Sequence, residues 1–213
     1  AKDYTMLPSF KGVYDLIPIA DLVESYRKEG KSWKYTSILF YEGDKQYVGS
    51  TIDGEQNEIK IYLRINPVFK SINQIIKEEN ISEKDAYYKY SHKIFEAKDA
   101  QSSIRQRIII ARDTFSITED LISIEYVPKT GRNKGKVYEQ FYKGSQCRLF
   151  AWLGDIGENI DGVLYKKNRL GTYWDATSTI NNLNKEGGVQ FPNGKKPESL
   201  ISRVIEMSTS KGD

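Results

Sequence analysis

The chain has 213 residues, of which 38% are hydrophobic, 12% are aromatic and 29% are charged, and its formal net charge is +3. A chain of this length and composition buries enough surface for one hydrophobic core, or for one core and a smaller second one. No apolar run approaches the roughly 20 residues of a membrane-spanning helix, so we expect no membrane span. We also expect no signal peptide, because no basic segment followed by an apolar stretch opens the chain.

Two residue types that occur once limit the chemistry of the chain. Cys147 is the one cysteine, which excludes an internal disulfide, and His92 is the one histidine. A conventional zinc site and a histidine-based catalytic triad are therefore excluded as well. We expect both residues to be packing or surface residues, and we expect no metal site and no catalytic residue in this chain. Because the chain starts at Ala1 without Met, we expect a piece of a longer protein.

The positive charge is concentrated in the second half of the chain. Residues 1–128 contain 18 Lys/Arg against 20 Asp/Glu, whereas residues 129–203 contain 13 against 7. Because Lys and Arg drive phosphate binding through counterion release, this asymmetry indicates a polyanionic partner for the second half. A solvated basic surface without a partner is the alternative.

The first third of the chain predicts a helix and a small sheet. Apolar residues followed by a charged run over 16–31 predict a short helix that Gly30 ends. Segments 33–41, 46–51 and 59–65 are rich in β-branched and aromatic residues and are separated by glycine-containing turns. They predict an antiparallel meander, and the alternation within 59–65 places one face of it inward.

Three helices are predicted next. Asn66 and Pro67 have the residue types of an N-cap and a first turn, so we predict a helix over residues 66–76. The string SEKD resembles a capping box for a second helix over residues 82–95. A third helix is predicted from about residue 99 to residue 112.

The second half returns to strands. Segments 121–127 and 136–143 predict a hairpin whose basic tip contains two glycines that permit positive φ values. Residues 144–155 predict a short helix, and residues 162–174 predict another strand pair around KKNR at 166–169. The whole pattern is that of an α+β domain with an antiparallel meander, a helical middle segment and a basic hairpin.

Several strings near the C-terminal end occur in a characteristic order. They are GTYWD at 171–175, NNLNKEGG at 181–188, FPNGKKPE at 191–198 and STSKGD at 208–213. This order resembles the target-recognition and motif X region of amino-methylating DNA methyltransferases, and especially the modification subunits of Type III restriction-modification systems. DAQSSIR at 99–105 and SIEYVPK at 123–129 also resemble that family, so the resemblance covers most of the chain.

Two motifs of that family are absent from this sequence. In the permuted motif order that the chain resembles, a catalytic Asp-Pro-Pro-Tyr motif precedes the recognition region. A glycine-rich loop that binds S-adenosylmethionine follows a string like STSKGD. The chain has six prolines, none adjacent to another, and it has no Phe-x-Gly-x-Gly. The resemblance therefore implies a parent protein that is an adenine N6 DNA methyltransferase using S-adenosylmethionine, with this chain as a catalytically inactive part of it.

The resemblance also implies domain limits and partners. Residues 1–30 would enter from the catalytic domain, residues 31–180 would form the target-recognition domain, and residues 181–213 would form the motif X segment that leads to the cofactor loop. The implied partners are double-stranded DNA, a second copy of the parent and a restriction subunit, all in the cytoplasm. A stand-alone nucleic-acid-binding module and a protein-interaction domain with a basic surface are the alternatives.

The basic hairpin is the first candidate DNA-binding site. A two-stranded ribbon fits the major groove, where Arg pairs with guanine and Asn or Gln pairs with adenine. The alternative is a solvated hairpin that only adds solubility. The candidate residues are Lys129, Arg132, Asn133, Lys134, Lys136 and Gln140, with Tyr138, Phe141 and Tyr142 as candidate aromatic contacts to a base or sugar.

Two further segments are candidate phosphate contacts. Amides and side chains at a helix start hold phosphate, which makes Gln101, Ser102, Ser103 and Arg105 candidates. The alternative is that Asp99 and Ser102 only cap that helix. A second basic cluster consists of Lys166, Lys167 and Arg169, with a solvated surface again as the alternative.

The segment before the last predicted helix is the candidate cofactor contact. Pro197 and Glu198 suit a helix start, and the apolar stripe after them predicts a helix that docks on the sheet of the methyltransferase domain. A cap followed by an ordinary core helix is the alternative. The resemblance implies that part of an S-adenosylmethionine pocket, incomplete in this chain, is lined by Asn193, Gly194, Lys195, Lys196 and Pro197.

Overall fold

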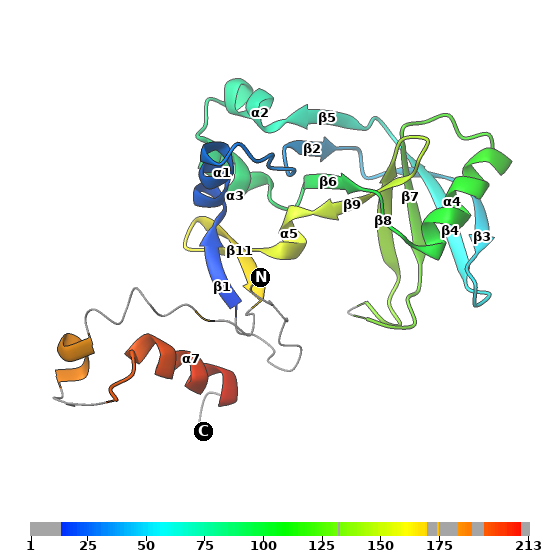
Figure 1. The fold of residues 1–213 in the computed structure, drawn as a ribbon. Coiled ribbons are helices and arrows are strands. Elements are labelled where there is room, and N and C mark those ends of the chain that lie inside the picture. Colours follow the sequence, from blue (N-terminus) through cyan, green and yellow to red (C-terminus); the bar gives the residue numbers. More distant parts are fainter. Residues whose placement is uncertain (1–13, 132, 170–173, 175–182, 189–193, 210–213) are drawn as a thin grey trace. The chain divides into compact units, whose positions relative to one another are not determined.

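A computed structural model of the chain describes residues 14–131, 133–169, 174, 183–188 and 194–209. The chain divides into two compact units, one of residues Pro18–Tyr165 and one of Ala1–Ile17 with Lys166–Asp213. The described elements mix helices with antiparallel sheets, which confirms the predicted α+β class (Figure 1). The predicted functional limits at residues 30 and 180 stay predictions.

The described strands are β1 (Tyr14–Pro18), β2 (Ser37–Phe40), β3 (Lys45–Ile52), β4 (Glu58–Arg64), β5 (Val68–Ser71), β6 (Ile94–Lys98), β7 (Leu121–Tyr126), β8 (Tyr138–Lys143), β9 (Arg148–Trp152), β10 (Gly157–Ile160) and β11 (Val163–Arg169). The helices are α1 (Ile19–Lys28), α2 (Ile72–Glu79), α3 (Glu83–Tyr90), α4 (Ser103–Thr114), α5 (Leu153–Ile156), the 3-10 helix η1 (Leu183–Gly188) and α7 (Glu198–Ser208).

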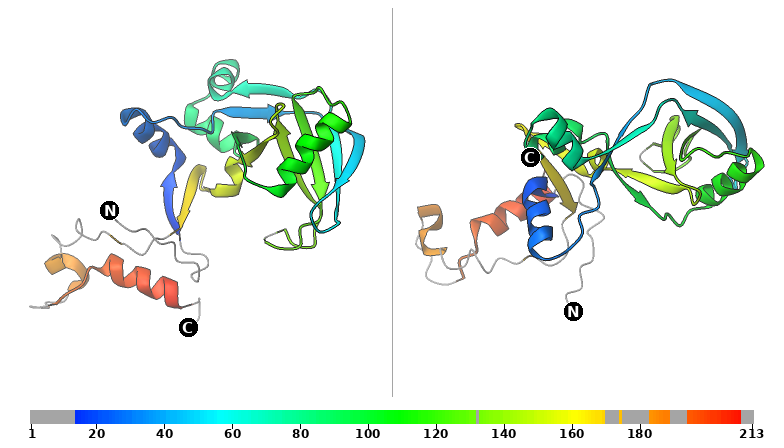
Figure 2. Two further views of the ribbon diagram at one scale, coloured as in Figure 1. Left: turned by 45° about the vertical axis from the view of Figure 1, so that its right-hand side comes forward. Right: turned by 90° about the horizontal axis from the view of Figure 1, so that it is seen from above.

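Eight strands form the main sheet, in the order β3-β4-β7-β8-β9-β6-β2-β5, and a three-stranded sheet has the order β1-β11-β10. The division between the two compact units runs through β1 and β11. In the main sheet, six residue pairs join β7 to β8, but only two join β8 to β9. The strand directions divide the sheet into a half with β3, β4, β7 and β8 and a half with β9, β6, β2 and β5 (Figures 1 and 2).

Each half of the main sheet has its own apolar core. Helix α4 packs on the β4 and β7 half, where Ile59, Ile61, Ile108 and Ile122 are fully buried. The prediction that one face of segment 59–65 points inward is therefore confirmed for Ile59 and Ile61. Helices α1, α2 and α3 pack on the other half around Ile38 and neighbouring apolar residues. A third, aromatic cluster joins the halves and consists of Leu39, Phe95, Leu121, Phe141 and Phe150.

The predicted meander is wrong in its first strand. β3 and β4 pair antiparallel as expected, but β2 pairs with β5 and β6 instead of β3. Alternating side chains identify a strand but do not specify its partner, because any strand with a complementary inner face satisfies the same pattern.

The helices predicted over residues 66–76 and 82–95 are wrong in their limits. Residues Val68–Ser71 form β5, and α2 begins after Ser71, whose hydroxyl accepts a hydrogen bond from the Gln74 amide at 3.1 Å. Gln74 Oε1 accepts from the Ser71 amide in return, so this reciprocal cap starts the helix where the Asn66–Pro67 pair does not. Ser82 caps α3 as predicted, but the helix ends at Tyr90. Residues Ile94–Lys98 then form β6, because pairing with β2 and β9 buries the apolar side chains at its start.

Three later predictions also need correction. Helix α4 begins at Ser103 with Ser102 as its cap, so Asp99 lies outside the helix that was expected to start there. Residues 144–155 form β9 and the single turn α5 rather than one short helix. Residues Val163–Arg169 form one continuous strand, so KKNR lies within β11 and not at a turn between two strands. The hairpin of β7 and β8 is confirmed.

Cys147 is fully buried in the core beneath α4, as expected for a packing residue. Burial raises the pKa of the Cys147 thiol above its ordinary value, so less thiolate forms at a given pH. We therefore expect slow labelling by a maleimide in native buffer, with a rate that rises with pH, and rapid labelling in urea. Rapid labelling of the native protein at pH 7 contradicts this placement.

Candidate nucleic-acid interface

The hairpin between β7 and β8 has a tip that its own backbone closes. The paired part of the two strands ends with Tyr126 opposite Tyr138. Beyond it the Gly135 amide donates to the Pro128 carbonyl at 2.8 Å, and Gly131 and Gly135 have φ values of +80° and +72°. Glycine adopts such angles without strain, so these two residues allow the tight turns of the tip.

The tip carries exposed positive charge. Lys134 and Lys136 are exposed, and Asn133 is half-buried beside them. Lys129 pairs with Glu55 at 2.9 Å, but the two side chains are 55% and 66% exposed. Because a pair that exposed stabilises little, Lys129 can exchange Glu55 for a phosphate at small cost.

The end of the paired strands that adjoins the tip is electrically balanced. Lys45 pairs with Glu125, Arg64 pairs with Glu139, and Lys45 Nζ also lies 4.0 Å from Glu139. These two cations and two carboxylates neutralise one another at the level of β4, β7 and β8. The excess of positive charge on this hairpin is therefore at its tip.

Two hairpin candidates, Gln140 and Arg132, are not among the described residues of the tip. Gln140 is half-buried on β8, and its Oε1 accepts a hydrogen bond from the Tyr142 hydroxyl at 2.9 Å. It therefore lies along the ribbon and not at the tip. Arg132 lies outside the described residues.

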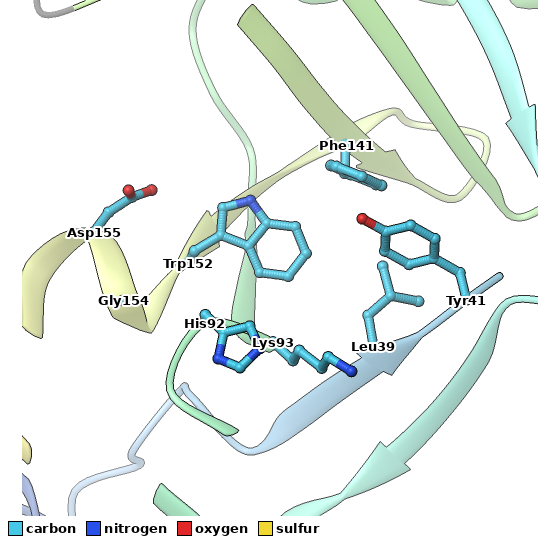
Figure 3. A pocket seen from close by; sticks show the side chains of 8 residues that line it. All are labelled: Leu39, Tyr41, His92, Lys93, Phe141, Trp152, Gly154 and Asp155. Carbon is cyan, nitrogen blue, oxygen red and sulfur yellow. The ribbon is translucent and has the colours of Figure 1, made fainter. Parts of the chain in front are cut away.

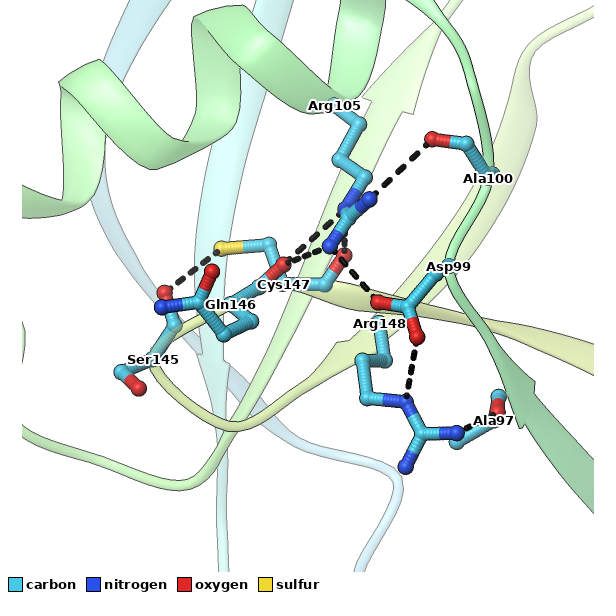
Figure 4. A network of polar contacts seen from close by, with 8 residues as sticks. All are labelled: Ala97, Asp99, Ala100, Arg105, Ser145, Gln146, Cys147 and Arg148. Atoms are coloured by element: carbon cyan, nitrogen blue, oxygen red, sulfur yellow. Dashed lines mark hydrogen bonds and ion pairs between the residues drawn. The ribbon is translucent and has the colours of Figure 1, made fainter.

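Arg105 lies inside the protein. It is 8% exposed, and its guanidinium donates to the carbonyls of Gln146 and Cys147 at 2.8 to 3.1 Å (Figure 4). It also donates to Asp99 at 2.8 Å and to the Ala100 carbonyl at 3.3 Å. A phosphate would have to displace these partners, so the predicted phosphate contact of Arg105 competes with a structural role.

Ser102 caps the N-terminus of α4. The Ser102 hydroxyl accepts a hydrogen bond from the Arg105 amide at 3.2 Å, which uses that hydroxyl as a structural cap. Gln101 and Ser103 are exposed on either side of it. Asp99 also lies 3.5 Å from Arg148 Nε, so one carboxylate faces two arginines there (Figure 4).

The second basic cluster does not form one surface. Lys166 and Lys167 are adjacent residues of β11, so their side chains leave opposite faces of the strand. Lys167 Nζ lies 5.8 Å from the centre of the Tyr14 ring. The side chain of Arg169 lies outside the described residues.

The segment before α7 is held by one glutamate. Lys195 Nζ donates to the Glu186 carbonyl at 2.6 Å, and the Glu186 carboxylate accepts from the first amide of α7 at 2.9 Å. Gly194 has a φ of +81°, Lys196 is exposed and Pro197 is buried as the residue before the helix. The fifth candidate, Asn193, lies outside the described residues.

Two general findings concern the described part of the chain. None of its helices is both long enough and apolar enough to cross a lipid bilayer. Among the same residues, no group of three or more His, Cys, Asp or Glu side chains is arranged to hold a metal ion.

The chain is 38% identical over 202 residues to the probable type III restriction-modification enzyme HindVI Mod subunit of Haemophilus influenzae. The match covers 94% of this chain and 26% of the relative, so the chain spans about a quarter of the length of the curated protein it matches. The relative is thus matched over one segment, and the chain is similar to that segment of a Type III Mod subunit. No family model matches the chain, and no solved structure matches it.

The match to a Mod subunit confirms the resemblance that the C-terminal strings predicted. The match of 94% of the chain also shows that the likeness extends far beyond those strings.

One feature of this chain was not predicted from its sequence. A pocket of about 630 Å³ opens where the two halves of the main sheet diverge (Figure 3). We call it the corner pocket, and its lining residues are Leu39, Tyr41, His92, Lys93, Phe141, Trp152, Gly154 and Asp155. They come from separate parts of the chain, so no local spacing could identify them together. The available signal was the aromatic density of residues 138–152, of which Phe141 was a candidate contact.

Proposed function

We propose that this chain is the DNA target-recognition segment of a Type III modification subunit, whose parent methylates adenine N6 with S-adenosylmethionine. The observation that carries the proposal is the exposed basic tip of the β7–β8 hairpin on a chain homologous to a Mod segment. In this proposal residues 31–180 recognise DNA, and residues 181–213 lead to the cofactor-binding part of the parent.

The hairpin is the proposed reading element. B-DNA has a major groove wide enough for a two-stranded ribbon, and base edges there distinguish all four base pairs. Lys134 and Lys136 would contact phosphates, and Asn133 with its neighbour Arg132 would face base edges. Phosphate contacts fix the orientation of the ribbon, whereas base contacts supply the sequence preference.

The apolar face of α7 supports a place for this chain next to another domain. Ile201, Val204 and Ile205 are 48%, 49% and 52% exposed. An amphipathic helix normally buries such a face. We propose that the face docks on the methyltransferase sheet of the parent, as the sequence resemblance implies.

The described residues of the segment 194–197 do not by themselves fit S-adenosylmethionine. Nothing lies within 4 Å of the position that a Cβ on Gly194 would occupy, so this turn forms no tight cradle. The Lys195 amine donates to the Glu186 carbonyl, and Pro197 is buried. Methyl donor binding is therefore proposed for the parent, and we assign no chemical step to this segment.

The partners and location follow from the same proposal. Type III systems combine modification with restriction, so we propose double-stranded DNA, a second copy of the parent and a restriction subunit as partners in the cytoplasm. The chain's excess of positive charge over residues 129–203 fits the first of these.

A salt titration of duplex binding tests the proposal. Each phosphate contact contributes about −0.9 to the slope of log K against log salt concentration, so Lys134→Ala with Lys136→Ala should make that slope less steep by about 1.8. The measurement uses the whole polypeptide that contains this chain and a duplex carrying its methylation site, with fluorescence anisotropy as the readout.

Two exposed lysines on the other half of the sheet provide the control. Lys77→Ala with Lys84→Ala removes the same charge from α2 and α3 and should leave the slope unchanged. An equal change for both double variants means that only net charge matters and rejects the hairpin as the contact surface. A slope near zero for the unaltered protein rejects DNA binding and favours a basic protein-interaction domain.

A further inference from the structure

The corner pocket is surrounded by aromatic rings from different strands. The centroids of Tyr41 and Phe141 are 5.4 Å apart, and those of Phe141 and Trp152 are also 5.4 Å apart with the rings at 85°. Trp152 additionally contacts Phe95 and Phe150 edge to face. Tyr41 is 40% exposed, so part of its ring faces solvent at the pocket. Exposed aromatic rings of this kind are the usual surfaces on which an unstacked nucleobase packs.

A buried arginine holds two of these rings in place. The Arg64 guanidinium carbon lies 4.9 Å from the centroid of Tyr41 and 5.1 Å from that of Phe141. The Arg64 side chain is 5% exposed, donates a hydrogen bond to the Ser123 hydroxyl and forms an ion pair with Glu139. It therefore cannot be a direct ligand contact and acts as a positioning residue for the rings.

The rim of the pocket carries one cation without a carboxylate. Lys93 runs beneath Trp152 toward Leu39 (Figure 3), its amine lies 5.0 Å from the centroid of the Phe40 ring, and it forms no ion pair with a described Asp or Glu. His92 is exposed beside it, and Asp155 lies at the α5 side of the pocket, apart from the rings (Figure 3). A cationic ligand is disfavoured by Lys93, whereas an aromatic ligand that bears a phosphate satisfies both the rings and the amine.

We propose that the corner pocket binds one unpaired nucleotide, with the base packed between Tyr41 and Trp152 and the phosphate at Lys93. The site is separate from the base pocket of a methyltransferase, because the Asp-Pro-Pro-Tyr motif that would build that pocket is absent from this sequence.

The nucleotide has two possible sources, and one of them rests on the proposed function. A nucleotide rotated out of a DNA duplex reaches the pocket only if the chain binds DNA, whereas a free nucleotide does not require it. Rotating a base out of the stack costs a few kcal/mol in general, and a bulged nucleotide has already lost its pairing. A duplex with a single bulged nucleotide is therefore the appropriate DNA probe.

Photo-crosslinking to 5-iodouracil tests the site in the whole polypeptide that contains this chain. One probe is a duplex in which the halogenated base is a single-nucleotide bulge, and the other is free 5-iodo-dUMP. Peptide mapping by mass spectrometry is expected to place the crosslink at Trp152 or Tyr41. A crosslink with the bulged duplex alone identifies DNA as the source, and a crosslink with the free nucleotide identifies a small ligand.

Two variants and one control make the result decisive. Lys93→Gln removes only the amine and should lower the crosslink yield and the affinity for the effective probe at least about fivefold. Trp152→Leu should do the same, provided that its circular dichroism is unchanged. Tyr88→Leu changes another exposed tyrosine, on α3, and should have no effect.

Failure of this inference is distinguishable from failure of DNA binding. Crosslinks that map only outside the pocket, or a yield that is the same in Lys93→Gln and the unaltered protein, overturn the nucleotide site. The salt dependence of binding to an unbulged duplex is measured in parallel and reports on the proposed function alone.

Discussion

Replacing Arg105 with alanine should lower the free energy of unfolding by about 3–5 kcal/mol, because each main-chain carbonyl that loses its buried donor costs about 1–3 kcal/mol. The Arg105 guanidinium donates to the carbonyls of Gln146 and Cys147 and to the Asp99 carboxylate. Alanine removes that donor from two main-chain carbonyls and leaves a void beside α4. For a folded unit of this size the melting temperature should fall on the order of 10 °C, as measured by circular dichroism.

Arg107 provides the matched control for this substitution. It lies two residues further along α4 and is exposed, so Arg107→Ala should change the free energy of unfolding by less than about 0.5 kcal/mol. A normal melting temperature for Arg105→Ala together with weaker DNA binding contradicts the structural role. That outcome favours the phosphate contact that the sequence predicted.

Replacing Arg64 with alanine should cause a loss of similar size, again about 3–5 kcal/mol. Its guanidinium bonds the Ser123 hydroxyl and the Gly43 carbonyl, both at 3.1 Å, and pairs with Glu139. Ser123 is fully buried, so its hydroxyl loses a partner that water cannot easily replace. The free energy of unfolding is measured by urea denaturation.

Two further variants separate charge from packing at this position. Arg64→Met retains an extended apolar side chain and should lose less stability than Arg64→Ala, because part of the packing against the rings is kept. Lys60→Ala, on the same strand but with a 49% exposed side chain, should have almost no effect. Equal urea midpoints for the Arg64→Ala and Lys60→Ala variants exclude the buried network as a source of stability.

Local sequence patterns predicted where strands and helices form better than they predicted which strands pair with each other. The alternation around Ile59 and Ile61 and the glycines of the β7–β8 hairpin act within a few residues, and both predictions are confirmed. The partners of β2 lie 28 or more positions along the chain in β5 and β6, so they depend on which inner faces fit together. The same long-range pairing turns Ile94–Lys98 into β6 where helical spacing predicts a longer helix.

For the candidate site, the sequence likewise could not tell which basic side chains are buried and which are exposed. Arg105 and Lys134 are equally basic in the sequence, yet one is 8% exposed among carbonyls and the other is exposed at a hairpin tip. Burial distinguishes them, and burial follows from tertiary packing. The corner pocket could be predicted even less from local sequence, because Tyr41, Lys93 and Trp152 approach one another only after the sheet has formed.

The short pairing between β8 and β9 affects how a protein of this kind could come to prefer a different DNA site. With two residue pairs at that junction, the relative orientation of the two sheet halves depends mainly on the aromatic cluster that fills it. A substitution at Phe150 or Phe95 would then tilt the hairpin without altering any residue at its tip. In a protein that reads DNA through this ribbon, new site preferences can therefore arise from interior mutations, while the exposed lysines stay the same.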